Sequence, residues 1–254
     1  MTVFRTENLS IGYKDKMLFS NLNFEIKTGI LTSLLGSNGI GKSTLLKTIS
    51  GLLDKKSGTV FIDEKNTDTF SIAEFAKMVS VVITHENVNK DLTVYELVKL
   101  GRQPYTNWLD KLTEDDEILI NNTLEDCEIS SLKDRKLSQL SDGQLQRTFI
   151  ARAVVQDTPF IFLDEPSTHL DLYHKVKLFK LLKKLCVVNN KCILFSTHDL
   201  DLALQLSDEI MLLKDDKFYH NTTNNLINDG IFDRFFDTDD IVFDKERKQF
   251  LIKN

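Results

Sequence analysis

Gly36-Ser37-Asn38-Gly39-Ile40-Gly41-Lys42-Ser43 matches the pattern Gly-x-x-x-x-Gly-Lys-Ser/Thr. It follows an apolar run, Ile30–Leu35, and precedes Leu45, Leu46 and Ile49 at helical spacing, so the local order is strand, loop, helix. Glycines at these positions let backbone N–H groups converge on an anion, and the following helix directs its positive N-terminal end toward it. The stretch, called the phosphate loop below, therefore predicts a site that wraps the phosphate chain of a nucleotide.

Side chains of the phosphate loop add specific contacts. Lys42 supplies a catalytic charge that reaches the terminal phosphates, and Ser43 supplies a hydroxyl for Mg²⁺. A merely structural glycine-rich turn is the alternative, and the strand–loop–helix context disfavours it. The residues expected to contact ATP are Gly36, Ser37, Asn38, Gly39, Ile40, Gly41, Lys42, Ser43 and Thr44.

A second apolar run, Phe160–Leu163, leads directly into two carboxylates, Asp164 and Glu165. Negative charge at the end of a buried strand is costly unless a cation lies nearby. In enzymes with a phosphate loop, the first acid holds Mg²⁺ with the loop hydroxyl, and a second carboxylate can polarise the attacking water. We therefore expect Asp164 and Ser43 to hold Mg²⁺ and Glu165 to be the catalytic base. Alone, the run could equally end in a turn at Pro166.

Two hydrophobic patterns run along the chain. Apolar and polar residues alternate in Val3–Leu9 and Leu22–Ile26, which predicts strands joined by short turns. In the second half, apolar strands without polar alternation are separated by helices. The predicted strands are Phe160–Leu163, Cys192–Phe195 and Ile210–Leu213, and the helices between them are Lys175–Val188 and Leu200–Leu206. This order predicts an α/β fold, in which helices flank a mostly parallel sheet and an antiparallel β region lies at the N-terminus.

Strand signals disappear between residues 88 and 156, where amphipathic patterns such as Ile118, Leu119, Leu124 and Cys127 predict an inserted helical subdomain. A chain of 254 residues is within reach of one α/β domain with an insertion. We expect a single domain over residues 1–254. Its predicted parts are a β core (1–87 and 157–214), a helical subdomain (88–156) and a tail without an assigned role (215–254).

Composition excludes several classes of protein. The 38 acidic residues outnumber the 32 Lys and Arg residues, and the net charge of −6 argues against a nucleic-acid binder with a broad basic surface. Cys127, Cys186 and Cys192 are odd in number and lie in apolar or helical context, which favours buried, reduced thiols. No secretory signal and no run of about 18 apolar residues is visible, so we expect another subunit to provide any membrane span.

Leu140-Ser141-Asp142-Gly143-Gln144 precedes a helix that we expect to begin at Leu145. Ser141 is a candidate cap, and Gly143 permits close backbone approach, so both can present N–H donors to an anion. Alone, the stretch could be an ordinary capped helix. In this order with the other motifs, it resembles the signature motif of ABC ATPases.

The remaining elements of that family occur in sequence from Val3 to Leu213. The resemblance implies that Tyr13 stacks on adenine, although an ordinary tyrosine at a strand edge is the alternative. It implies that the loop Ser167–Asp171 crosses a dimer interface, with Asp171 as its acid, and that His198 contacts the γ-phosphate and senses its loss. The sequence departs from the family where a glutamine usually follows the strand Val79–Ile83. Thr84-His85-Glu86 stands there, with Thr84 or His85 as its replacement.

The resemblance also implies partners. Two chains are expected to clamp two ATP molecules head to tail as a homodimer, with Ser141, Gly143, Gln144 and Asp171 acting in trans on the nucleotide held by Lys42 of the other copy. A polytopic membrane permease would hold the dimer at the cytoplasmic face of the membrane, and a substrate-binding protein would be reached indirectly. No nucleic-acid partner is expected.

Leu92–Val98 and Gly101-Arg102-Gln103-Pro104-Tyr105 look like the segment found in importers of iron-siderophore, haem and cobalamin. A helix stopped by Gly101 and Pro104 is the structural alternative. An ATPase for efflux or iron–sulfur cluster assembly would share every catalytic motif. A soluble ABC protein acting on ribosomes or DNA would normally show tandem cassettes, a coiled-coil arm or a basic face, and none is visible in this sequence.

Overall fold

The computed structural model describes residues 2–83, 88–106, 111–168, 170–233, 235–236, 238 and 240–253. At its centre lies a six-stranded sheet in the order β10-β9-β3-β8-β7-β6. β3 pairs in parallel with β8 and β9, β7 pairs in parallel with β6 and β8, and β10 joins β9 antiparallel. The predicted mostly parallel sheet is confirmed. Its strands are β3 (Leu31–Gly36), β6 (Val79–Val82), β7 (Phe160–Leu163), β8 (Cys192–Ser196), β9 (Glu209–Lys214) and β10 (Lys217–Thr222).

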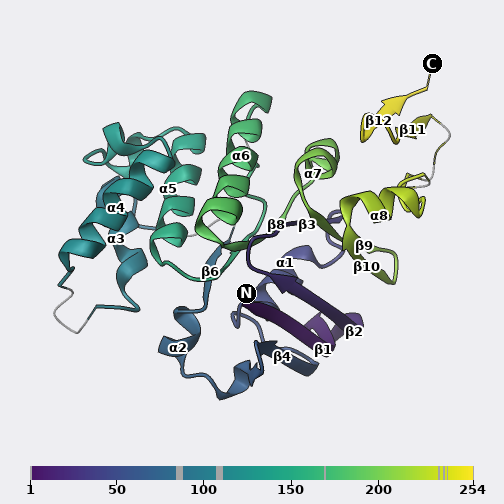
Figure 1. The fold of residues 1–254 in the computed structure, drawn as a ribbon, viewed down its shortest axis with the longest axis horizontal. Coiled ribbons are helices and arrows are strands. Elements are labelled where there is room, and N and C mark those ends of the chain that lie inside the picture. Colours follow the sequence, from purple (N-terminus) through teal and green to yellow (C-terminus); the bar gives the residue numbers. More distant parts are fainter. Residues whose placement is uncertain are drawn as a thin grey trace.

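The N-terminal region forms a second, antiparallel sheet in the order β2-β1-β4-β5 (Figure 1). Phe4 of β1 is fully buried and packs edge-on against Phe160 and Phe162 of β7, with ring centroids 5.4 Å apart in both pairs. Side chains of α1 (Lys42–Ile49) belong to the same apolar cluster, so this sheet and α1 cover one face of the parallel sheet. The other elements of this region are β1 (Val3–Tyr13), β2 (Lys16–Lys27), β4 (Ser57–Ile62), β5 (Lys65–Asn66) and α2 (Ile72–Ala76).

α6 (Leu172–Asn189) covers the opposite face of the parallel sheet. Ile161 and Phe195 lie in the apolar cluster of α6, whereas the neighbouring Phe160 and Phe162 lie in that of α1. Phe179 of α6 packs edge-on against Phe195, with ring centroids 4.9 Å apart. Because both faces of β7 and β8 are buried, these strands show no apolar–polar alternation.

α6 extends beyond the predicted Lys175–Val188 at both ends. The side chain of Asp171 accepts the N–H of His174 at 2.9 Å and so caps the first turn. At the other end, Asn190 adopts the left-handed conformation with φ of 52°, and its N–H donates to Leu185. The caps, rather than hydrophobic periodicity, therefore set the length of this helix.

The described residues between 88 and 156, called the helical segment below, form helices, and their only β pairing is an isolated bridge between Thr93 and Lys136. The predicted helical character is confirmed. Within α4, Ile118 is 57% exposed, which corrects its place in the predicted apolar stripe. Ile120 is buried instead, together with the predicted Leu124 and Cys127, because residues four and three positions apart share one helix face. The helices are α3 (Val94–Lys99), α4 (Glu114–Asp126) and α5 (Asp142–Val155).

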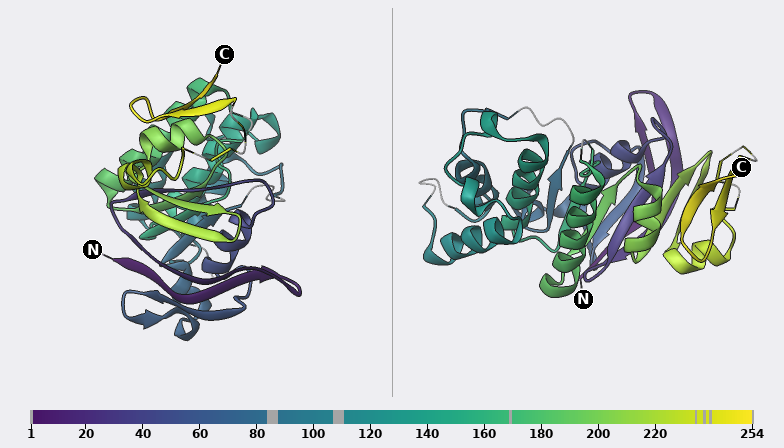
Figure 2. Two further views of the ribbon diagram at one scale, coloured as in Figure 1. Left: turned by 90° about the vertical axis from the view of Figure 1, so that its right-hand side faces the viewer. Right: turned by 90° about the horizontal axis from the view of Figure 1, so that it is seen from above.

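The C-terminal segment, residues 215–253, is drawn in yellow-green to yellow at one end of the molecule (Figure 2). Its last strand, β12, contacts α7. The N–H of Phe250 donates to Asp201 of α7 at 3.0 Å. Phe232 is 1% exposed and stacks near Phe235 and Phe243, with ring centroids 6.1 and 5.6 Å away. Aromatic packing therefore anchors a segment to which the sequence assigned no role. The elements of this segment include α8 (Thr223–Asn228), β11 (Ile241–Asp244) and β12 (Gln249–Ile252), and the neighbouring helix is α7 (Leu200–Leu206).

All three cysteines are buried, free thiols, as the sequence predicted. Burial raises the pKa of Cys127 and of Cys186 to about 12. A thiol that ionises so reluctantly is a poor nucleophile and a poor metal ligand. The cysteines therefore serve as small apolar side chains in the core.

Candidate active site

The phosphate loop joins β3 to α1, the order that the sequence predicted. Gly36, Gly39 and Gly41 have φ of 151°, 75° and 125°, values that residues with a Cβ rarely adopt. A Cβ at Gly36 would also lie 2.6 Å from the carbonyl oxygen of Leu213. Gly41, the N-cap of α1, has no side chain to cap the helix, so the first-turn amides remain available to an anion.

Lys42 lies inside the phosphate loop and is 5% exposed. Its Nζ donates to the carbonyl oxygens of Gly36 at 2.9 Å and of Ser37 at 3.2 Å. Burial lowers the pKa of the Lys42 ammonium from its ordinary value of 10.5, although Glu165 and Asp164 oppose this shift. The backbone thus holds the ammonium where a phosphate entering the loop would meet it.

Ser43, near the start of α1, meets Asp164, just after β7. Ser43 Oγ donates to Asp164 Oδ1 at 3.0 Å. Asp164 is 5% exposed and also accepts from Ser196 Oγ at 2.7 Å. A hydroxyl and a carboxylate are hard oxygen donors of the kind that Mg²⁺ uses when phosphates supply further ligands. The chemistry of this pair therefore fits Mg²⁺.

Glu165 has φ of 49°, in the left-handed region that is uncommon for a residue with a side chain. His198 Nε2 lies within hydrogen-bonding distance of Glu165 Oε1. Thr168 Oγ1 donates to Glu165 Oε2 at 3.3 Å. Each carboxylate oxygen of Glu165 therefore has a partner that orients it, and two residues predicted separately are in contact.

Tyr13 lies at the end of β1, opposite Lys16 of β2, and is 59% exposed. Leu18, further along β2, lies against the phosphate loop, because a Cβ at Gly41 would be 3.3 Å from Leu18 Cδ1. The end of this hairpin therefore lies near the loop, where an exposed aromatic ring can receive a base. The role of Tyr13 at adenine stays a prediction.

The signature motif, residues 140–144, forms the start of α5. The helix begins at Asp142 and not at the predicted Leu145. Ser141 Oγ accepts the N–H of Gln144 at 3.3 Å, and the Gln144 side chain accepts the N–H of Ser141 at 3.0 Å. This reciprocal capping box stabilises the first turn and explains the earlier start. The prediction that Ser141 is the cap is confirmed.

Two separate cavities are lined by some of the predicted residues. One cavity has a volume of about 460 Å³ and is lined by phosphate-loop residues together with His198. The other has a volume of about 320 Å³ and is lined by Ser141, Gly143, Gln144 and Asp171. The two share no lining residue among those described. Within one chain, contacts join Ser43 to Asp164 and His198 to Glu165. The signature motif lines a cavity whose lining includes none of these residues.

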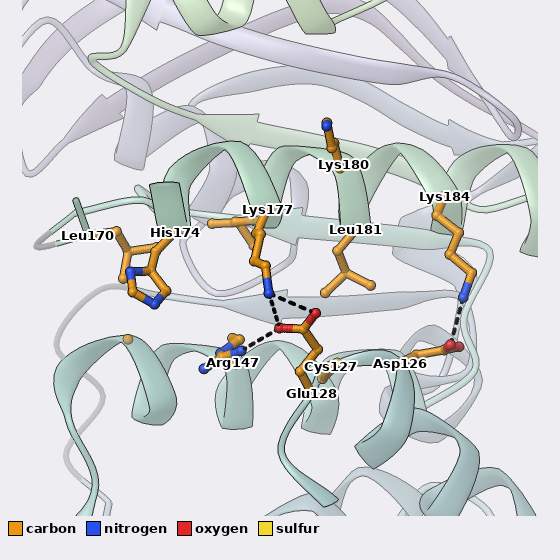
Figure 3. Close-up of a pocket in the computed structure, with 12 residues that line it drawn as sticks. Asp126, Cys127, Glu128, Arg147, Leu170, His174, Lys177, Lys180, Leu181 and Lys184 are labelled. Carbon is orange, nitrogen blue, oxygen red and sulfur yellow. Dashed lines mark hydrogen bonds and ion pairs between the residues drawn. The ribbon is translucent and has the colours of Figure 1, made fainter. Parts of the chain in front are cut away.

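The signature cavity borders a further cavity of about 290 Å³ between α5 and α6 (Figure 3). Glu128 accepts from Lys177 of α6 at 2.9 Å and from Arg147 of α5 at 3.2 Å, and Lys184 of α6 donates to Asp126 at 2.7 Å. These ion pairs join the helical segment to α6. The lining residues shared by the two cavities are Gly143, Arg147, Leu170 and His174.

Two expectations fall outside the described residues. Thr84, His85 and Glu86 occupy the position of the missing glutamine, and His169 lies in the loop expected at the dimer interface. The replacement for the glutamine therefore stays a prediction.

Sequence reasoning missed two polar residues that contact the predicted catalytic groups. Thr168 bonds to the Glu165 side chain, and Ser196 bonds to both Asp164 and the Glu165 backbone. The available signal for Ser196 was a hydroxyl residue at the end of an otherwise apolar strand, Cys192–Ser196. That signal does not name the partner, which comes from a different strand.

Comparison with known proteins places this geometry in a family. The model of the family described as ABC transporter matches residues 19–168, more than half of the chain. The petrobactin import ATP-binding protein YclP of Bacillus subtilis is 37% identical over 231 residues, which are 91% of this chain and 91% of YclP. The iron(3+)-hydroxamate import ATP-binding protein FhuC of the same organism is 36% identical over 214 residues, 84% of this chain and 80% of FhuC.

Solved structures agree. The dimeric structure of MJ0796, a bacterial ABC transporter cassette, is 28% identical and superposes with a TM-score of 0.75, covering 87% of this chain and 98% of that one. The chain therefore belongs to the ABC transporter family and is one of its ATP-hydrolysing cassettes.

Proposed function

We propose that this ATPase energises a membrane importer whose cargo is an iron-siderophore or a related chelate such as haem or cobalamin. The observation that carries the proposal is the identity with YclP, an import protein for petrobactin, over 91% of both chains. FhuC, an import protein for iron(3+)-hydroxamate, supports the same class. The stretch Gly101–Tyr105, which resembles a segment of importers of iron-siderophore, haem and cobalamin, agrees with this class.

The chemistry proposed for this site is in-line transfer of the γ-phosphoryl group of ATP to water. Lys42 and the first-turn amides of α1 bind the phosphates, because they offer a positive charge and unpaired donors at one place. Mg²⁺, when bound by Ser43 and Asp164, would offset the charge on the phosphate oxygens. Glu165 accepts the proton of the attacking water through a carboxylate oxygen.

His198 is proposed to act beside Glu165. Its contact with Glu165 Oε1 supports a role in orienting the base, and its place in the cavity next to the phosphate loop supports contact with the γ-phosphate. When hydrolysis removes the γ-phosphate, His198 loses its proposed contact with that group and keeps its contact with Glu165. This side chain is therefore the proposed sensor of the nucleotide state.

A second copy of the chain is proposed to complete each site. A separate cavity is lined by Ser141, Gly143, Gln144 and Asp171, and Lys42 is not in its lining. In a head-to-tail dimer, the start of α5 would cover the phosphates bound by the other copy, and two ATP molecules would be clamped. The dimeric MJ0796 cassette supports this arrangement.

A groove of about 810 Å³ supports a permease as the partner. It runs between the end of α1, α2 and α5, with Phe75 and Arg152 in its lining. Leu52 and Ile72 beside it are 55% and 92% exposed. A groove with apolar walls and polar groups suits an amphipathic helix. We assign it to a cytoplasmic segment of a polytopic permease, through which the chain would reach the membrane and, indirectly, a substrate-binding protein.

The described residues contain no helix that is both long and apolar enough to cross a membrane. Co-purification therefore tests the partner directly. The tagged chain is pulled from detergent-solubilised native membranes, and bound proteins, metals and porphyrins are identified. We expect a polytopic permease. Efflux or iron–sulfur assembly proteins instead would leave the ATPase chemistry intact but overturn import. Nucleic acid is not expected, given the net charge of −6.

Two substitutions test the assigned chemistry. Lys42→Ala is expected to abolish ATP binding, because the phosphates lose their buried cation. Glu165→Gln is expected to bind ATP, to lose about 100-fold or more in turnover and to accumulate as a closed dimer, because the base is removed while the phosphate contacts remain. Turnover, equilibrium binding and gel filtration measure these effects. Equal turnover of the wild type and Glu165→Gln would remove Glu165 as the base.

A further inference from the structure

Ser196 ends β8 and is fully buried. Its Oγ donates to Asp164 Oδ1 at 2.7 Å and accepts the N–H of Glu165 at 2.8 Å. A serine hydroxyl has one hydrogen to donate and lone pairs to accept with. The two hydrogen bonds therefore form a relay that runs from the Glu165 N–H, through the Ser196 hydroxyl, to the Asp164 carboxylate.

This hydrogen-bond relay holds both the Glu165 backbone and the Asp164 carboxylate. The Glu165 backbone adopts φ of 49°, an uncommon conformation that persists only where its surroundings hold it. Its N–H is directed to Ser196, so the hydroxyl determines where the carboxylate of the base emerges. Asp164 Oδ1 receives hydroxyls from both Ser196 and Ser43, which hold one carboxylate oxygen in place and leave its orientation little freedom.

Packing does not call for a hydroxyl at this position. The preceding residues Leu194 and Phe195 are apolar and fully buried. Thr32, in the adjacent strand β3, is equally buried, and its hydroxyl has no hydrogen-bond partner in the described part of the chain. A buried hydroxyl in this sheet is therefore not automatically bonded to a catalytic residue, and the two bonds of Ser196 are specific.

We propose that Ser196 is a positioning residue for ATP hydrolysis, whose hydroxyl sets the Glu165 backbone and the Asp164 carboxylate in their working geometry. The proposal rests on the proposed roles of these two acids. In this proposal Ser196 acts through Glu165 and Asp164, the two residues to which its hydroxyl is hydrogen bonded. His198 follows two residues later on the same chain segment, so the strand that presents the proposed sensor also anchors the proposed base.

Two substitutions of equal shape isolate the hydroxyl. Ser196→Thr keeps it, Ser196→Val removes it, and the two side chains otherwise occupy the same volume. We expect Ser196→Thr to retain kcat within about threefold and Ser196→Val to lose about tenfold or more, with KM for ATP unchanged. The Mg²⁺ concentration for half-maximal rate should rise in Ser196→Val only. Binding of a fluorescent ATP analogue in EDTA should match in both variants.

Thr32→Val is the matched control, because it removes a buried hydroxyl from the same sheet and should leave kcat unchanged. Equal kcat for Ser196→Thr and Ser196→Val would overturn the proposal. So would a loss of analogue binding and of Tm in Ser196→Val that accounts for its lower rate, since Ser196 would then be structural. An active Glu165→Gln variant would instead contradict the proposed role of Glu165 as the base. The failure of the Ser196 proposal and the failure of the proposed function are therefore distinguishable.

Discussion

Arg102 is a long cationic side chain that the helical segment buries, with 9% of the residue exposed. Its Nε donates to Asp116 Oδ1 at 2.7 Å, and its Nη1 donates to the carbonyl oxygen of Val155 at 2.9 Å. The guanidinium also lies 4.0 Å from the ring centroid of Tyr105. An arginine with several donors in a fixed plane can hold all three partners together, which a lysine cannot.

These contacts give a structural account of the stretch Gly101–Tyr105, which the sequence linked to a branch of importers. A Cβ at Gly101 would lie 2.3 Å from the carbonyl oxygen of Arg152, so only glycine allows this approach to α5. The structural alternative of a helix that stops here also holds in part, because α3 ends at Lys99 and a short 3-10 turn follows. The stretch therefore has a packing role in this fold, beside its resemblance to a segment of importers.

Replacing Arg102 tests this arrangement. Arg102→Met leaves the Asp116 carboxylate buried without its cation, and we expect the free energy of unfolding to fall by about 3 kcal/mol at pH 7. Adding Asp116→Asn removes the buried charge and should restore roughly half of the loss, because the amide oxygen can still accept from Thr113. Urea unfolding of the three proteins measures both effects. A double variant less stable than Arg102→Met would contradict the explanation.

Acid provides a further check on this ion pair. Burial opposes ionisation of Asp116, but hydrogen bonds from Thr113 and the contact with Arg102 outweigh it and hold the pKa of the carboxyl below its ordinary value of 3.8. Because the folded pKa is the lower one, the stabilisation is present above 3.8 and is lost as the pH falls through the folded value. The difference in stability between the wild type and Arg102→Met should therefore narrow in acid. A difference that widens there would be inconsistent with this sign.

At the scale of elements, hydrophobic periodicity predicts where α6 lies, whereas its capping residues determine where it begins and ends. Apolar residues such as Leu178, Leu182 and Leu185 are buried on one face, which is the pattern that located the helix in the sequence. The ends depend on single side chains, Asp171 and Asn190, whose capping bonds have no hydrophobic signature. Periodicity therefore gave the middle of α6 and missed several residues at its start.

Asn190 offers a test of that end. Asn190→Gly should leave stability nearly unchanged, because glycine adopts the left-handed conformation freely. Asn190→Ala should lower the free energy of unfolding by about 1 kcal/mol, because alanine keeps the Cβ that disfavours positive φ but lacks the polar side chain that lets asparagine adopt it. Thermal unfolding of the pair separates this conformational effect from the loss of the amide, which both variants share. If the two variants unfold at the same temperature, the cap does not limit stability.

At the scale of the whole molecule, the phosphate loop and the signature motif line two cavities that share no lining residue among those described. The phosphate loop belongs to the parallel sheet and the signature motif to the helical segment, and ion pairs of Glu128 and Asp126 join that segment to α6. A rearrangement of the helical segment against α6 would have to break these pairs. The proposed dimer closure and permease movement would therefore both act on the contact between the helical segment and α6.

Mixing two inactive variants tests the shared site. Lys42→Ala breaks the phosphate loop, and Ser141→Arg blocks the start of α5, so neither homodimer should hydrolyse ATP. Heterodimers of the two keep one intact site, built from Lys42 of one copy and Ser141 of the other. We expect the equimolar mixture to recover up to about a quarter of the wild-type rate, since half the dimers are mixed and each has one working site. No recovery despite demonstrated heterodimers would contradict sites shared between copies.

The sequence by itself determined the local chemistry and the order of elements. The phosphate loop, the acids after Phe160–Leu163 and the Ser141 cap of α5 were predicted with their residues, because each depends on a few adjacent positions. The parallel sheet followed from strands without alternation, since burial on both faces leaves that trace in the sequence.

Only the tertiary structure decided which of these groups meet. Ser196 bonds to Asp164 across 32 positions of the chain, and His198 meets Glu165 across 33. Arg102 finds Asp116 through the packing of separate helices. Hydrophobic patterns report which face of an element is buried, but not the register of one strand against the next or the direction of a polar side chain at its end. Those contacts are fixed when the strands and helices pack, so a single sequence leaves them open.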